Sequence, residues 1–210
     1  MDRDTSNTCA GEWDFPKKKC IVCGLHCVMR VTECLFRPIK KYAQENGCVE
    51  AVNIVLKRYG VNYQMHPVKS TKNESKSVYK PPKFQGNECS KVCDAIPTIL
   101  RAMYGVQKNE AVPSDPVLKS MFGHQLRLWH NWSVVFKNMF DLQPSIADQA
   151  QYPKDVTAFA TALMCFSGKQ ELSALYLHIV VAHSRTVMKE WNSIGKYMHC
   201  LLYTSPSPRD

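Results

Sequence analysis

The chain has 210 residues, of which 45% are hydrophobic and 21% are charged, and its formal net charge is +9. This composition is typical of a globular protein and excludes a fibrous or wholly disordered chain. The positive charge is uneven, because residues 1–105 contain 17 lysines and arginines against 10 acidic residues, whereas residues 106–210 contain 10 against 8. A basic half favours a polyanionic partner such as DNA.

The first residues of the chain and its apolar runs bear on secretion and membrane insertion. The first residues, MDRDTSNTCAGEWDF, lack the apolar segment of a secretory signal, and the longest apolar run, residues 175–182, is too short to span a bilayer. We therefore expect an intracellular protein with reduced cysteines and no membrane association. The last residues, CLLYTSPSPRD, differ from all that precedes them and resemble a translated sequencing adapter, so we expect residues 200–210 to be an artefactual tail.

Residues 25–44 show the clearest helical pattern. Pro38 predicts a kink or a restart within this helix. One expected face is mostly apolar, with Leu25, Val28, Met29, Thr32, Leu35, Phe36, Ile39 and Ala43, and the opposite face is polar, with His26, Arg30, Glu33, Arg37, Lys40 and Gln44. The motif face formed by His26, Arg30 and Glu33 has two interpretations, namely a functional patch or an ordinary polar surface with an Arg30–Glu33 ion pair.

The next segments are a short helix ending at Gly60 and a basic stretch rich in proline and lysine. The lysines of this stretch predict contacts with a phosphate backbone, and Tyr79 and Phe84 are candidates for stacking on bases, although a solvated loop is the alternative. The candidate nucleic-acid-binding residues are Lys69, Lys72, Lys76, Lys80 and Lys83.

Four further helices are expected after the basic stretch. Cys89, Cys93, Ile96, Leu100 and Met103 form a buried stripe on the first of them. Ser114, Asp115 and Pro116 begin a long helix to about residue 140, Pro153 begins the third, and the last covers residues 171–191.

The chain is thus predicted to be mainly α, with five or six helices around one core and at most a short strand near residues 18–22. We divide it into a helical segment with a cysteine cluster (1–60), a basic linker (61–86), a helical domain (87–199) and the tail (200–210).

The cysteines and histidines predict no metal site. Two thiolates on one zinc ion must lie within about 4.6 Å of each other, whereas Cys27 and Cys34 lie about 10 Å apart along a helix. Buried free thiols are therefore favoured, and a zinc site that joins Cys20 and Cys23 to distant ligands is the alternative. His178 and His183 would point about 140° apart on an α-helix. We assign neither a metal nor a cofactor.

Three stretches, CIVCGLHCVMRVTECLF, FQGNECSKVCDAI and ALYLHIVVAHSRTVMKEWNSIGKYMH, resemble in the same order three blocks of uncharacterised transposon-derived proteins. The first matches an LHxxxRxxE pattern at Leu25, His26, Arg30 and Glu33, the second a GNxC pattern at Gly86, Asn87 and Cys89, and the third a histidine-rich helix ending in a GxxGxF-like turn. These proteins resemble cut-and-paste transposases.

The resemblance implies a fragment of an α/β RNase H-like domain with a helical insertion, DNA as partner and a nuclear location. Such enzymes hold two Mg²⁺ or Mn²⁺ ions with separated carboxylates. Glu33 or Asp14 is the only candidate for the middle carboxylate, and the other two would lie beyond the ends of the chain. We therefore expect a truncated, catalytically incomplete protein. The competing hypothesis is a non-enzymatic helical protein-interaction module with a structural zinc.

Overall fold

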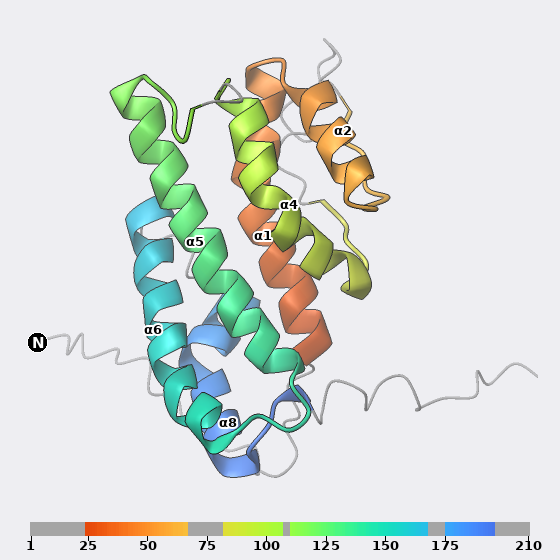
Figure 1. Ribbon diagram of the computed structural model, residues 1–210. Coiled ribbons are helices and arrows are strands. Elements are labelled where there is room, and N and C mark those ends of the chain that lie inside the picture. The colour runs from red at the N-terminus through yellow and green to blue at the C-terminus, as the bar shows by residue number, and fades with distance from the viewer. Residues whose placement is uncertain (1–23, 67–81, 107–109, 168–174, 196–210) are drawn as a thin grey trace, which may run out of the picture.

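The computed structural model describes residues 24–66, 82–106, 110–167 and 175–195 (Figure 1). These residues are mainly helical, as the sequence predicts, and the described ranges contain no strand; the strand expected near residues 18–22 and the tail lie outside them. The helices are α1 (Gly24–Glu45), α2 (Val49–Arg58), α4 (Gly86–Met103), α5 (Pro116–Phe140), α6 (Ile146–Ser167), α7 (Leu175–His178), the π-helix η2 (Ile179–His183) and α8 (Ser184–Trp191).

The helix α1 lies in the middle of the molecule (Figure 1). It contacts α2, α4, α5 and α7, while α5 and α6 pack against each other as an antiparallel pair, and α8 and η2 lie against α6. No helix in the described part of the chain is long and apolar enough to cross a membrane.

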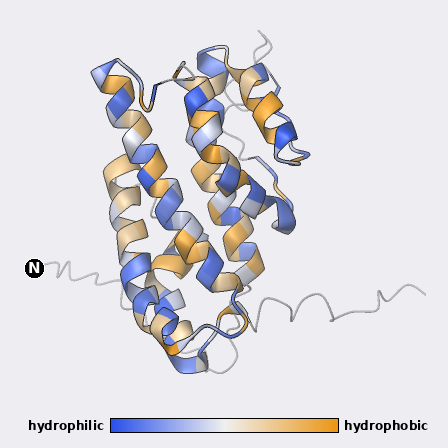
Figure 2. Cartoon of the chain, in the orientation of Figure 1, coloured by the Kyte–Doolittle hydropathy of each residue, from blue (hydrophilic) through white to orange (hydrophobic). Residues whose placement is uncertain are grey.

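The prediction of a fully exposed polar face on α1 is wrong, because other helices surround α1 on several sides. The expected apolar residues Val28, Phe36 and Ile39 are buried, but so are Glu33 and Lys40, which the pattern placed opposite them. A helix that packs against neighbours on several sides buries more of its circumference than the single apolar stripe of a surface helix. Most of the other helices keep mixed faces, as the alternating colours in Figure 2 show.

The helix ends follow local capping chemistry. The carboxylate of Asp115 accepts a hydrogen bond from the Leu118 amide at 2.9 Å, which confirms the predicted start of α5. Gly60 has a φ of +72°, as expected for the residue that ends α2.

The predicted start of α6 at Pro153 is wrong, because the helix begins seven residues earlier. Ser145 and Asp148 cap each other there: the Asp148 amide donates to the Ser145 hydroxyl at 3.1 Å, and the Asp148 carboxylate accepts from the Ser145 amide at 3.2 Å. Pro153 therefore lies inside α6. Pro38 lies inside α1 and Pro97 inside α4, so no new helix begins at either of these two prolines.

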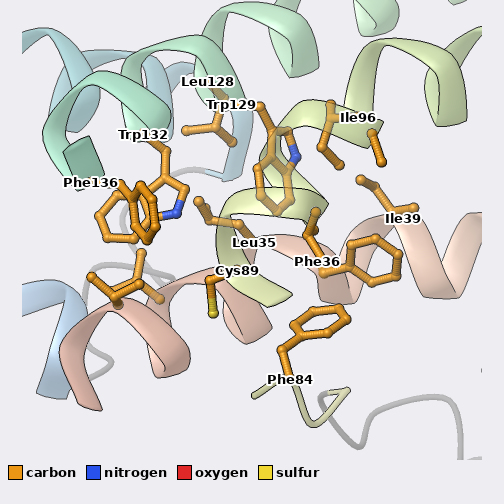
Figure 3. Close-up of a cluster of buried hydrophobic side chains, with 14 of the residues drawn as sticks. Leu35, Phe36, Ile39, Phe84, Cys89, Ile96, Leu128, Trp129, Trp132 and Phe136 are labelled. Atoms are coloured by element: carbon orange, nitrogen blue, oxygen red, sulfur yellow. The ribbon is translucent and has the colours of Figure 1, made fainter. Parts of the chain in front are cut away.

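The core is one cluster of side chains from all parts of the described chain. Figure 3 shows its centre, where Phe36 of α1, Ile96 of α4 and Trp129 of α5 point toward one another. Phe84, which precedes α4, closes this cluster from below, with its ring centroid 5.2 Å from that of Phe36. Residues on both sides of the basic stretch are thus held in the same core.

Candidate functional site

Glu33, the glutamate of the motif, forms hydrogen bonds that connect two segments of the chain. Its side chain is only 3% exposed, and one carboxylate oxygen accepts a hydrogen bond from the Arg30 guanidinium at 2.7 Å. The other oxygen accepts from the backbone amide of Phe84 at 3.3 Å. Glu33 therefore ties α1 to the residues that precede α4.

Arg30 and His26 lie on the solvent side of this pair. The Arg30 side chain is about half exposed, and the hydrogen bond to Glu33 together with the negative charge of Glu33 raises the pKa of the guanidinium. His26 is exposed as well. The motif face therefore consists of two exposed basic side chains, His26 and Arg30, and one buried acid, Glu33. Asp14, the other candidate for a catalytic carboxylate, lies outside the described residues.

Removing the Glu33 carboxylate should loosen this attachment. We expect Glu33→Ala to lower the free energy of unfolding by about 1–3 kcal/mol, because the buried Phe84 amide loses its acceptor. The control is Glu45→Ala, since Glu45 makes only a surface ion pair with Lys41 at 3.9 Å, and this change should cost no more than about 0.5 kcal/mol. Urea unfolding of the two variants measures the difference; equal effects would show that Glu33 does not hold Phe84.

The chain is attached to the helices on both sides of the basic stretch, which is the lysine-rich segment between His66 and Phe84. Before it, the amide of Asn53 exchanges two hydrogen bonds of 2.8 Å with the backbone of Met65, and the Gln44 side chain donates to the His66 carbonyl at 2.8 Å. After it, the Glu88 carboxylate accepts from the backbone amides of Asn62 at 2.7 Å and Gln85 at 2.9 Å. One buried side chain, Glu88, therefore joins the segments on both sides.

Exposed cations surround these attachments. Lys57 and Arg58 lie at the end of α2, Lys83 lies just before α4, and the ammonium of Lys91 donates to the carbonyl of Gly60 at 3.1 Å. Of the lysines predicted to bind nucleic acid, Lys83 is exposed, while Lys69, Lys72, Lys76 and Lys80 lie outside the described residues.

The prediction that Phe84 stacks on bases is wrong. Its side chain is 2% exposed, and its ring packs edge-on against Phe36 and Tyr63 at centroid distances of 5.2 and 5.3 Å. A ring enclosed in this way has no face available to a base. Tyr79, the other candidate, lies outside the described residues.

Two of the described cysteines, Cys27 and Cys89, belong to the core. Cys27 and Cys89 are buried free thiols, which confirms the core position predicted for Cys89. Burial raises the pKa of the Cys89 thiol to about 12, so it stays protonated at neutral pH and is a poor metal ligand or nucleophile. Cys20 and Cys23, the alternative zinc ligands, lie outside the described residues.

The prediction that His178 and His183 point in different directions is wrong. Both rings are exposed, and their Nε2 atoms lie 3.1 Å apart. The five residues that end in His183 form a π-helix, in which hydrogen bonds join residues five apart and the α-helical angle no longer applies. Five residues is the spacing at which a π-turn brings two side chains together, but the spacing alone does not predict such a turn.

No protein-family model, curated protein or solved structure matches this chain. Within the described residues, no group of three or more histidine, cysteine, aspartate or glutamate side chains is placed to hold a metal ion.

Proposed function

We propose that this chain is a transposase-derived protein that associates with nucleic acid through the lysines between His66 and Phe84 and does not itself cleave it. The observation that carries the proposal is the fixing of the chain on both sides of this lysine-rich stretch to buried residues of α1, α2 and α4. The residues that flank the lysines, His66 and Phe84, are thus both attached to the helical body of the protein.

The charge of this region supports a polyanion as the partner. Five lysines and one glutamate lie between His66 and Phe84, and the exposed cations Lys57, Arg58 and Lys91 lie on the neighbouring ends of α2 and α4. The acid in their midst, Glu88, is buried and accepts hydrogen bonds from two backbone amides. Phosphate contacts by such cations bind without regard to base sequence.

Catalysis by Glu33 would conflict with its surroundings. Two-metal hydrolysis requires carboxylate oxygens that are free to bind metal, whereas both oxygens of Glu33 accept hydrogen bonds and the side chain is enclosed. The RNase H-like origin and the nuclear location are proposed from the sequence resemblance alone. Magnesium- or manganese-dependent nicking of DNA that Glu33→Gln abolishes would refute the absence of cleavage.

Replacing the five lysines should change how binding responds to salt. Each phosphate contact contributes about 0.9 to the slope of log affinity against log salt concentration, so five contacts weaken binding roughly 500-fold over a fourfold rise in salt. We expect the variant with Lys69, Lys72, Lys76, Lys80 and Lys83 changed to Ala to lose about 4.5 units of this slope. Fluorescence anisotropy with a labelled DNA duplex measures it.

The matched control removes the same number of positive charges from other exposed positions, on α5, α6 and α8: Lys119, Arg127, Lys137, Lys154 and Lys189. Its slope should change by less than about one unit, the contribution of one phosphate contact. If both variants lost the same amount of slope, the salt dependence would reflect the net charge of the protein and not the position of the lysines. No binding by the unaltered chain even at low salt would favour the helical protein-interaction module instead.

A further inference from the structure

The π-helix η2 creates an arrangement that the proposed function does not use. It inserts one wide turn between α7 and α8, and the amide of Ser184 donates to the carbonyl of Ile179, five residues earlier. In an α-helix the same number of residues would turn the second side chain about 140° away from the first. The wide turn instead brings His178 and His183 together on the surface.

Buried hydrogen bonds hold this turn in place. The hydroxyl of Ser184 donates to the carbonyl of Val180, and the hydroxyl of Tyr152 on α6 donates to the Ser184 oxygen at 3.0 Å. Tyr152 and Val180 are fully buried, and Ser184 is 5% exposed. The π-turn is therefore attached to the core, so the two histidines project from a fixed support. Turns of this kind are frequent at functional sites.

The distance between the two rings suits a shared metal ion. Metal–nitrogen bonds of about 2.0–2.1 Å to two atoms 3.1 Å apart require an angle of about 100° at the metal, between the square-planar and tetrahedral values. In the metal-free protein the same distance fits an N–H···N hydrogen bond between neutral rings with complementary tautomers. Metal binding then requires the donating ring to move its proton from Nε2 to Nδ1, so that both Nε2 lone pairs are available to the ion and both rings stay neutral.

We propose that His178 and His183 form a surface site for a first-row transition-metal dication, with Cu²⁺ bound most tightly and Zn²⁺ or Ni²⁺ less so. Imidazole nitrogens suit these ions, and Cu²⁺ heads their affinity order. The described residues supply no third ligand, and both rings are exposed. The remaining coordination positions are open to water or to a donor group of a bound partner, so the site is an open one.

The test uses the full chain and the Cu²⁺ complex of iminodiacetate, which leaves adjacent coordination positions free for two nitrogens. Pulsed electron paramagnetic resonance should show one bound Cu²⁺ with two imidazole ligands. His178→Ala and His183→Ala should each weaken binding roughly a hundredfold, because the second ligand acts intramolecularly once the first has bound. Circular dichroism should show unchanged helix content in both variants, since both side chains are exposed.

The matched control is the double variant His124→Ala and His130→Ala, which removes two exposed histidines of α5. It should bind the copper complex like the unaltered chain. Binding that survives both single changes at His178 and His183, a signal without two imidazole nitrogens, or equal losses in the control would refute the site. Absence of binding by the unaltered chain would refute it as well, and none of these outcomes bears on nucleic-acid binding by the lysines.

Discussion

Phe36→Ala is expected to lower the free energy of unfolding by about 3–5 kcal/mol, the usual cost of emptying a buried aromatic site. Phe36 is fully buried, and its ring packs edge-on against Tyr63, Phe84 and Trp129 at centroid distances of 6.4, 5.2 and 6.4 Å. These partners come from both sides of the basic stretch and from α5. The loss would therefore loosen the anchorage of that stretch as well as the core.

The control for Phe36 is Lys41→Ala on the same helix. Lys41 is exposed and makes a surface ion pair of 3.9 Å with Glu45, so its change should stay within about 0.5 kcal/mol. Lys40, which the sequence pattern offered as an exposed position, is buried and cannot serve this purpose. Urea unfolding followed by circular dichroism measures both variants, and equal small losses would contradict the position of Phe36 in the core.

Trp132→Ala should have an effect of similar size, about 3–5 kcal/mol. The indole is fully buried between helices, with its ring centroid 5.2 Å from Phe159 of α6. Its N–H donates to the hydroxyl of Thr32 on α1 at 3.1 Å, so one side chain connects α1, α5 and α6.

Trp132→Phe separates packing from hydrogen bonding at this position. It keeps an aromatic ring and removes the indole N–H, and Thr32→Val removes the other partner. Each of these changes should cost less than Trp132→Ala, and the double variant should be less destabilised than the sum of the two, because they share one hydrogen bond. Full additivity in denaturant melts would show that the contact contributes nothing.

The sequence predicted the helices well because they depend on local patterns. The buried stripe of α4 and the start of α5 at Asp115 follow from residue spacing and capping chemistry alone. The start of α6 was missed because Pro153 is a familiar first residue of a helix, whereas the helix begins seven residues earlier, at Ile146, next to the cap formed by Ser145 and Asp148.

The candidate site was harder to predict, because it depends on contacts between distant segments. Periodicity placed Glu33 on a polar surface, whereas the surrounding helices enclose it and Phe84, fifty-one residues later, supplies an amide for its carboxylate. The His178–His183 pair depends on a π-turn that a hydrogen bond from Tyr152 to Ser184 supports. An angle calculated for a regular α-helix could not reveal it.

We propose that the lysines between His66 and Phe84 contact nucleic acid. Acetylation of the full chain with and without a DNA duplex, followed by mass spectrometry of each lysine, tests this proposal. We expect DNA to protect Lys69, Lys72, Lys76, Lys80 and Lys83 and to leave Lys119 and Lys154 as reactive as they are without DNA. Protection confined to the lysines of α5 and α6, or no protection under conditions where DNA is bound, would contradict it.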